Sequence, residues 1–241
     1  MSKKNRRPQL ISTNQILNKT SLNMRMVSPK TEKQTEAFVE YQLGNNLLLH
    51  GSAGTGKTFI SMYLALQDVF DYHNDMHKVT IVRSVVPTRN MGYLPGSEKQ
   101  KIQIYEQPYS SIVNDLFGRG DAYEILKKKD MIDFKSTSFI RGMTFDNTVI
   151  VVDECQNLNF HELDTIMTRV GQDSKIMFSG DFDQTDLRED EEKAGLGQFI
   201  KIINEMDEFY SCEFDIGDIV RSGLVRSYII QKYNTGLGDR K

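Results

Sequence analysis

Two stretches of the sequence carry side chains that could bind and cleave a phosphate chain. The first is GSAGTGKT at residues 51–58, which fits the pattern G-x-x-x-x-G-K-[S/T] at every fixed position. Its glycines let backbone N–H groups turn towards a phosphate, Lys57 can reach the β- and γ-phosphates, and Thr58 can ligate Mg²⁺. The predicted nucleotide-binding residues are Gly51, Ser52, Ala53, Gly54, Thr55, Gly56, Lys57 and Thr58.

The second stretch is VVDECQN at residues 151–157, where two carboxylates stand side by side after an aliphatic run. An enzyme with a phosphate-binding loop needs a second strand that ends in an aspartate to hold Mg²⁺, and Asp153 fills that place. Glu154 is then placed to orient or deprotonate the attacking water. Cys155 is expected to be a small buried residue behind the site and not a nucleophile.

The elements that must position these side chains alternate along the chain. Short aliphatic runs predict strands, and the glycine-rich turn follows the first strand and opens a helix. This alternation predicts an α/β fold with a mostly parallel sheet flanked by helices on both faces. Residues 131–145 alternate weakly and predict a hairpin or ribbon. The predicted strands are 47–50, 78–83, 148–153, 175–180 and 209–214, and the predicted helices are 30–43, 57–70, 109–117, 159–171, 196–207 and 218–233.

The chain has 241 residues and a formal net charge of −3, which fits one α/β domain with a core. Residues 1–30 carry seven Lys and Arg and no Asp or Glu. We therefore divide the chain into a basic arm, residues 1–28, and an ordered domain, residues 29–241. Such an arm fits a phosphate-bearing partner such as RNA or DNA, and it fits a solvated, disordered tail equally well. The spacing of the two cysteines fits neither a metal site nor a set of disulfides, so a cytoplasmic protein is expected. No apolar run is long enough for a membrane helix, so no contact with a membrane is expected.

Six blocks of the sequence follow one another in a fixed order. They are TEKQ (31–34), GSAGTGKT (51–58), VRSVVPTRNMGYLPG (82–96), FIRGMTFDNTVIVVDECQN (139–157), MTRVGQDSKIMFSGDFDQTDL (167–187) and DIVRSGLVRSYI (218–229). In this order they resemble the PhoH-like ATPases, relatives of superfamily 1 helicases with a single RecA-like core, and the resemblance covers about residues 29–234. Three departures are Cys155 for a usual Ala, Ser222-Gly223 for a usual His-Pro, and Met143 for a usual Arg that would be one nucleic-acid contact.

The resemblance implies ATP and Mg²⁺ as cofactors and assigns roles to further polar side chains. Gln34 would read the adenine, and Gln156 would contact the γ-phosphate or the attacking water. Gln184 would sense the γ-phosphate, and Asp181 would support the Mg²⁺.

A single core also lacks the arginine finger that helicases with two cores take from the second core. The finger must then come from a neighbouring subunit or from the chain's own C-terminal segment. Arg221 is the first candidate, and Arg169 and Arg226 are the next. The resemblance points to a homo-oligomer, a hexameric ring, in which each active site is shared between subunits.

Five residues on predicted loops are candidates for nucleic-acid binding, because single strands cross RecA-like cores at such loops. They are Arg83, Thr88, Arg89, Arg141 and Thr144, with Tyr93 and Phe139 able to stack on bases. The expected function is Mg²⁺-dependent ATP hydrolysis by an oligomeric RecA-like ATPase that acts on RNA or another single-stranded nucleic acid, as a helicase or an accessory of RNA processing. The alternatives are a small-molecule kinase built on the same phosphate loop and a nucleotide-gated scaffold without motor activity.

Overall fold

A computed structural model describes residues 22–85, 98–182, 187 and 190–235 of the chain. Four of the predicted functional residues lie outside the described residues, as does most of the predicted basic arm. These four are Thr88, Arg89, Tyr93 and Gln184.

The centre of the molecule is a six-stranded sheet in the order β3-β2-β4-β5-β1-β6. Every pairing between neighbouring strands is parallel, so the carboxyl ends of the strands share one edge. The central strand β4 is buried along its whole length, as expected for a parallel sheet covered on both faces. The strands are β1 (Asn46–Gly51), β2 (Lys78–Arg83), β3 (Ile132–Ser136), β4 (Thr148–Asp153), β5 (Lys175–Gly180) and β6 (Phe209–Phe214).

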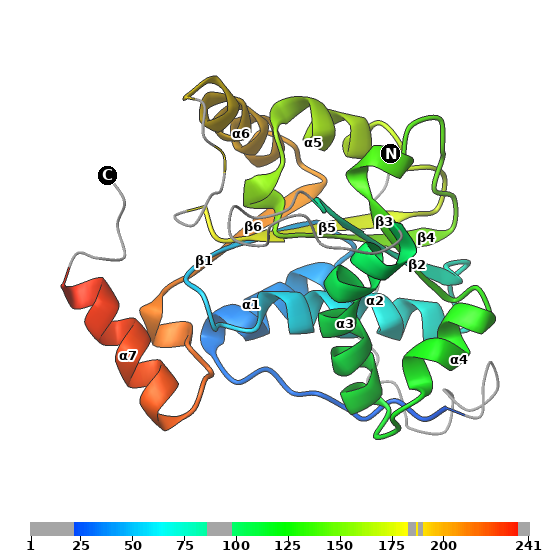
Figure 1. The fold of residues 1–241 in the computed structure, drawn as a ribbon, viewed down its shortest axis with the longest axis horizontal. Helices are drawn as coiled ribbons and strands as arrows, with labels where there is room; N and C mark the ends of the chain where they lie inside the picture. Colours follow the sequence, from blue (N-terminus) through cyan, green and yellow to red (C-terminus); the bar gives the residue numbers. More distant parts are fainter. Residues whose placement is uncertain (1–21, 86–97, 183–186, 188–189, 236–241) are drawn as a thin grey trace.

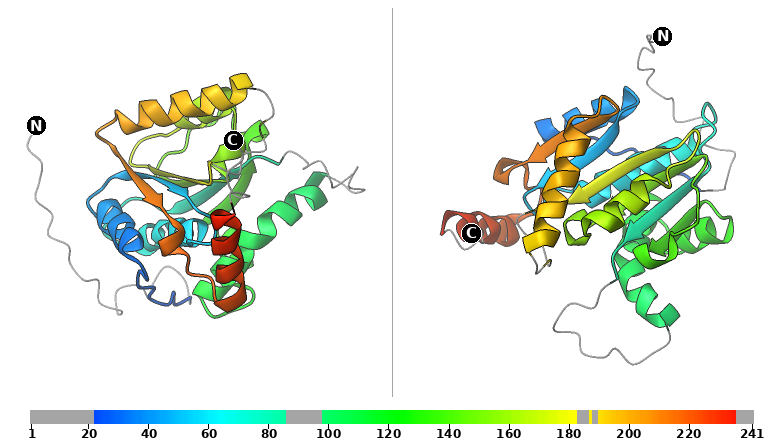
Figure 2. Two further views of the ribbon diagram at one scale, coloured as in Figure 1. Left: turned by 90° about the vertical axis from the view of Figure 1, so that its left-hand side faces the viewer. Right: turned by 90° about the horizontal axis from the view of Figure 1, so that it is seen from above.

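Helices cover both faces of this sheet (Figure 1). One layer holds α1 (Glu32–Gln42), α2 (Lys57–Phe70), α3 (Glu98–Leu116) and α4 (Ala122–Lys128), and the other holds α5 (Phe160–Met167) and α6 (Asp190–Asn204). The last helix, α7 (Gly223–Asn234), stands to the side of the sheet (Figures 1 and 2). Within the described ranges, no helix is both long and apolar enough to cross a membrane.

The predicted α/β fold is confirmed, one predicted helix is longer than expected, and one local prediction is wrong. The predicted helix 109–117 is the end of α3, which begins at Glu98 and continues through Pro108. Ile102 and Tyr105 pack against the core, and this burial offsets the cost of a proline inside a helix. Residues 131–145 do not form a hairpin, because β3 pairs in parallel with β2 as an edge strand.

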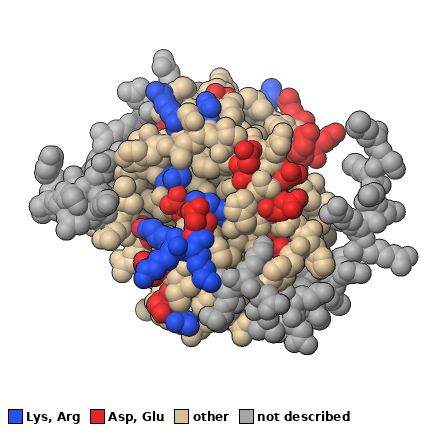
Figure 3. Space-filling model, turned by 90° about the vertical axis from the view of Figure 1, so that its right-hand side faces the viewer, with Lys and Arg blue, Asp and Glu red and all other residues tan. Residues whose placement is uncertain are grey.

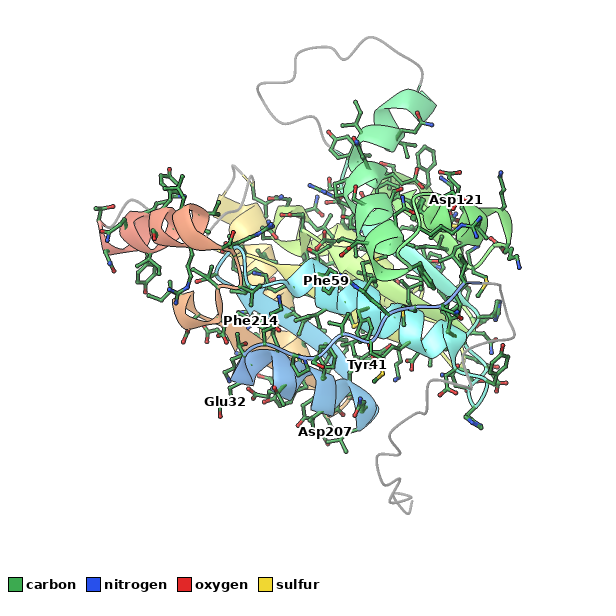
Figure 4. The ribbon with its side chains drawn as sticks, turned by 90° about the horizontal axis from the view of Figure 1, so that it is seen from below. Glu32, Tyr41, Phe59, Asp121, Asp207 and Phe214 are labelled. Carbon is green, nitrogen blue, oxygen red and sulfur yellow. The ribbon has the colours of Figure 1, made fainter. Side chains whose placement is uncertain are left out.

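The predicted arm boundary at residue 28 also differs from the structure. Leu22 is only 2% exposed and belongs to the main hydrophobic core. The backbone N–H of Arg25 donates to the carbonyl of Leu116 at 2.8 Å, and the N–H of Val27 donates to the Tyr63 hydroxyl at 3.2 Å. Figure 4 shows this extended segment crossing α2 before α1 begins. We call residues 22–30 the N-terminal strap, since they hold to the body of the domain.

Gly51, at the end of β1, lies where the phosphate loop is in close contact with the neighbouring strand β6. Its φ is +105°, and a Cβ there would lie 2.1 Å from the carbonyl oxygen of Phe214 in β6. Gly51→Ala is therefore expected to lower the free energy of unfolding by about 3 kcal/mol or more, as measured by urea unfolding without nucleotide.

The matched control is Gly44→Ala. Gly44 has a φ of +101°, and a Cβ there would have no heavy atom within 4 Å, so this change introduces backbone strain without a clash. It is expected to cost about 1 kcal/mol. Equal costs for the two variants would show that the contact with Phe214 has no part in joining the loop to the sheet.

Candidate nucleotide site

A cavity of about 1010 Å³ opens at the carboxyl edge of the sheet. Ligand sites of open parallel sheets are expected at this edge, because the loops that follow the strands converge there. The cavity brings together the strap, the phosphate loop, the ends of β2, β4 and β5, and the segment that leads into α7. Its polar lining includes Arg25, Lys30, Gln34, Lys57, Thr58, Arg83, Asp115, Asp153, Glu154, Gln156, Asn157, Asp181, Arg221 and Lys232.

The phosphate loop connects β1 to α2 with left-handed backbone at Gly54 and Gly56, where φ is +80° and +91°. Lys57 folds back over the loop, and its Nζ donates to the carbonyls of Gly51 at 2.7 Å and Ser52 at 2.8 Å. Burial lowers the pKa of the Lys57 ammonium, while the charges of Asp181, Asp153 and Glu154 act in the opposite direction. A phosphate chain on this loop would supply the negative charge that the buried ammonium needs.

Asp153 is fixed by hydroxyl groups from three elements. Its Oδ1 accepts hydrogen bonds from Thr58 Oγ1 of α2 at 2.9 Å and from Ser179 Oγ of β5 at 2.7 Å. Its Oδ2 accepts a hydrogen bond from Tyr109 Oη of α3 at 2.8 Å. Burial raises the pKa of the Tyr109 phenol well above its ordinary value, and the charge of Asp153 raises it further, so the phenol is a hydrogen-bond donor.

The oxygens of Thr58 and Asp153 fit a magnesium ion. Both are hard oxygen ligands, they lie within 2.9 Å of each other, and they face the cavity beside Lys57. Mg²⁺ is usually held by one or two carboxylates together with substrate phosphates. Among the residues that the structure describes, no three His, Cys, Asp or Glu side chains cluster in a way that could hold a metal ion.

Glu154 follows Asp153 in the left-handed backbone region, with φ of +54°, and this turn directs its side chain into the cavity. Its Oε2 accepts a hydrogen bond from Gln156 Nε2 at 2.5 Å. The Oε1 of Gln156 in turn accepts from the backbone N–H of Asp181 at 3.1 Å. Gln156 is 2% exposed, and these two hydrogen bonds connect the turn after β4 to the turn after β5.

Cys155 is a free, buried cysteine in the hydrophobic cluster that also contains Val152, Leu158 and Phe178.

Gln34 of α1 lies at the opposite wall of the cavity and is 5% exposed. Its Nε2 donates to the carbonyl of Thr55 at 2.8 Å, and its Oε1 accepts from the backbone N–H of Lys30 at 2.8 Å. The amide thus ties the strap to the phosphate loop. A base that binds beside the strap would meet this amide as well.

Arg221 lies in the cavity of its own chain. The N–H of Val220 donates to the carbonyl of Gly54 at 3.1 Å. A Cβ on Gly54 would lie 3.1 Å from Cγ of Arg221 and 3.4 Å from Cδ1 of Ile229 in α7. These contacts place Arg221 beside the phosphate loop of its own chain.

Arg83, a predicted nucleic-acid residue, also lines the nucleotide cavity. Its guanidinium lies 5.8 Å from the ring centroid of Tyr105. Burial alone would lower the pKa of Arg83, but Tyr109 and the carboxylates of Glu154 and Asp153 raise it overall. The residue therefore faces the nucleotide side of the sheet edge.

Other predicted residues lie away from the cavity lining. Arg169 follows α5, its carbonyl accepts from the N–H of Phe145 at 2.9 Å, and its Nε is buried without a hydrogen-bond partner among the described residues. Arg226 is exposed on α7. Arg141 and Thr144 are exposed in the segment after β3, where Arg141 contacts His161 at 2.7 Å, and Phe139 is 51% exposed.

Charged side chains of both signs share the face shown in Figure 3. Several basic residues of the domain are paired with acids on the surface, as Arg25 is with Asp115 and Arg119 is with Asp121. Exposed pairs of this kind add little stability and leave less free positive charge for phosphates. The face in this view is therefore not a uniformly basic surface.

Some residues of the site belong to no recognisable sequence motif. Tyr109 lies in a helix without such a pattern, and it meets Asp153 across 44 positions of sequence. The strap contributes Arg25 and Lys30 to the cavity, and α7 contributes Lys232. For Ser179 the sequence gives only a weak indication of a place in the site, because this residue directly precedes Gly180 and Asp181 at the end of β5.

A sequence model of the family described as PhoH-like protein matches residues 26–234 of the chain. The PhoH-like protein of Bacillus subtilis (strain 168) is 31% identical over 207 residues, which is 85% of this chain and 63% of that protein. The PhoH-like protein of Synechocystis sp. (strain ATCC 27184 / PCC 6803 / Kazusa) is 30% identical over 209 residues, or 86% of this chain and 62% of that protein. The chain thus spans a little less than two thirds of the length of these relatives.

Among solved structures, the fold is similar to the large terminase from a thermophilic bacteriophage. The TM-score is 0.53 with 11% sequence identity, over 85% of this chain and 50% of that chain. A crystal form of the same terminase in complex with ADP gives a TM-score of 0.51, again with 11% identity and the same coverage. At this identity the likeness concerns the fold, which is that of a RecA-like P-loop protein.

Proposed function

Since the chain belongs to the PhoH-like protein family, we propose that it is an ATPase that hydrolyses ATP with Mg²⁺ and works on single-stranded nucleic acid, RNA or DNA. The observation that carries the proposal is the meeting of Lys57, Thr58, Asp153 and Glu154 in one cavity. A site that only bound a nucleotide would have no need of the carboxylate of Glu154 beside the phosphate loop.

In this proposal each side chain has one task. The ammonium of Lys57 leaves the loop carbonyls and binds the β- and γ-phosphates, assisted by the N–H groups at the start of α2. Glu154 accepts a proton from the water that attacks the γ-phosphorus, and Gln156 holds that carboxylate through the 2.5 Å hydrogen bond. Arg221 supplies positive charge to the transferring phosphoryl group from the same chain.

Magnesium would be held by Thr58 and Asp153. When bound with ATP, the ion supplies charge neutralisation on the phosphate oxygens. The protein's own contribution is the fixed carboxylate of Asp153, which takes hydrogen bonds from three hydroxyl groups. The strap and Gln34 close the other side of the cavity, where the base of the nucleotide would lie.

We further propose that the ATPase assembles into a ring of identical subunits and that the assembly acts in the cytoplasm. Helix α7 supports assembly, because it has no buried side chain and its outer surface exposes apolar residues that a neighbour would cover. Arg169 and Arg226 lie outside the cavity of their own chain, where a neighbouring subunit could use them. The exposed apolar residues are Leu224, Val225, Tyr228 and Tyr233.

Phosphate release from ATP should rise several-fold when single-stranded RNA or DNA is added to the purified protein with Mg²⁺, because Arg141 and Thr144 are exposed in the segment after β3, where a nucleic-acid strand can reach them. The assay compares a single-stranded oligonucleotide with a duplex of the same sequence, and the mass of the assembly is measured by light scattering. ATP hydrolysis that neither strand stimulates, together with no binding of either strand, would overturn the motor function. Transfer of phosphate to a small acceptor instead of water would favour a kinase.

A further inference from the structure

Tyr109 is a buried polar side chain of the site that touches Asp153 and has no direct task in the proposed hydrolysis. It is completely buried and comes from α3, a helix that contributes no residue to the phosphate loop or to the motif around Asp153. Its hydroxyl donates to Asp153 Oδ2 at 2.8 Å. Nothing in the hydrophobic core requires a hydroxyl at this position, since phenylalanine has the same ring.

The hydrogen bonds around Asp153 divide between its two oxygens. Oδ1 accepts hydrogen bonds from the hydroxyls of Thr58 and Ser179, whereas Oδ2 accepts one from the Tyr109 hydroxyl. Without Tyr109 the carboxylate could rotate about its Cβ–Cγ bond while keeping both of the other partners near. The tyrosine therefore fixes the plane of the carboxylate.

We propose that Tyr109 is a positioning residue that holds Asp153 in the orientation required to bind the Mg²⁺ of a magnesium–nucleotide complex. This inference rests on the proposed function, because it concerns the same site. Hydrogen-bonded partners of a metal-binding carboxylate orient it, and their removal typically lowers metal affinity about 10- to 100-fold.

Arg83 completes the chain of interactions from the other side. Its guanidinium lies over the ring of Tyr105, one helical turn before Tyr109 on the same face of α3, and its charge acts on the Tyr109 phenol. The order of interactions is thus Arg83, Tyr109, Asp153. The positive charge of Arg83 also offsets part of the repulsion between Asp153 and Glu154. Arg83 acts in this arrangement through Tyr109, and its proposed place is in the nucleotide site.

The test is Tyr109→Phe, with binding of a fluorescent ADP analogue measured in excess Mg²⁺ and again in EDTA. Wild-type protein is expected to bind the analogue more tightly with Mg²⁺. In Tyr109→Phe this Mg²⁺-dependent gain should shrink by about 10-fold or more, and the Mg²⁺ concentration for half-maximal binding should rise by the same factor. Affinity in EDTA should stay within about twofold of wild type, because the phosphate loop is unchanged.

The matched control is Tyr123→Phe. Tyr123 is a buried tyrosine of α4, 1% exposed, and its hydroxyl donates to the carboxylate of Glu106 at 2.6 Å, outside the cavity lining. This variant loses the same kind of hydrogen bond and should keep the full Mg²⁺-dependent gain. Tyr109→Met, which fills part of the same space without a hydroxyl, should show the same Mg²⁺-specific loss and serves if Tyr109→Phe fails to fold.

Two results would overturn the inference. One is a Tyr109→Phe protein, or a folded Tyr109→Met protein in its place, with the full Mg²⁺-dependent gain. The other is an equal loss of affinity with and without Mg²⁺, which would mean that the hydroxyl shapes the pocket and does not orient Asp153. Failure of the proposed function has a different signature, since wild-type protein would then bind the analogue no better with Mg²⁺ than in EDTA.

Discussion

Glu154→Gln is expected to lower the rate of ATP hydrolysis by about 10²- to 10⁴-fold, the usual contribution of a general base. ATP binding should stay within about threefold of wild type, because the substitution keeps the size of the side chain and leaves the phosphate loop intact. The two measurements are phosphate release at saturating ATP and Mg²⁺, and binding of a fluorescent ATP analogue.

The geometry explains why this change separates binding from turnover. The left-handed backbone at Glu154 and the hydrogen bond from Gln156 hold the carboxylate in the cavity independently of the phosphate loop. A glutamine at the same position can still accept a hydrogen bond from Gln156 through its amide oxygen. It cannot take a proton from water, so the chemical step is the one that suffers.

The control is Glu205→Gln, which removes one charge from an exposed position after α6. It should hydrolyse ATP at the wild-type rate. If Glu154→Gln retained more than about a tenth of wild-type turnover, Glu154 would not be the general base of the reaction.

Lys57→Ala should weaken ATP binding by at least about 100-fold and abolish measurable turnover. Hydrogen bonds from a charged group contribute about 1.5–3 kcal/mol each, and the ammonium can make two with the phosphates. Each 1.4 kcal/mol corresponds to about tenfold in affinity. Nucleotide at about 100 times its Kd should stabilise the wild-type protein by about 2.7 kcal/mol, and this gain, seen as a rise in Tm, should disappear in the variant.

Without nucleotide, the same variant should unfold at nearly the wild-type temperature. Burial lowers the pKa of Lys57, which means that the charged form is costly where it lies, and its removal relieves that cost. The control is Lys201→Ala on the exposed side of α6, which should keep the nucleotide-induced rise in Tm. A large drop in Tm without nucleotide would show that Lys57 supports the fold, and the loss of binding could then not be assigned to phosphate contacts.

The parts of the molecule that the sequence could predict are those in which chemistry and structure are local. The phosphate loop and α2 follow from one stretch of glycines and the helical pattern after it, and helix 57–70 has the predicted bounds. The strand 148–153 likewise ends at Asp153 as predicted, because a fully buried parallel strand reads as a continuous aliphatic run.

The parts that escaped prediction depend on contacts between distant segments. Leu22 is buried because it fits the main core, although the residues around it are polar and irregular in sequence. Tyr109 became part of the site because α3 crosses the edge of the sheet, which no spacing in the sequence indicates. Arg83 follows a strand, as do nucleic-acid residues in related folds, and only its neighbours in space show that it faces the nucleotide.

The contact between Gly54 and the C-terminal segment has a consequence for communication along the molecule. Helix α7 has no buried side chain, so the sheet core does little to fix its position. Val220, Arg221 and Ile229 instead place it against the phosphate loop. We expect a rearrangement of that loop around a phosphate chain to shift α7 as well, together with the apolar side chains that would contact a neighbouring subunit in the proposed ring. Through this helix, which stands beside the sheet, one subunit could then respond to the nucleotide bound by the next.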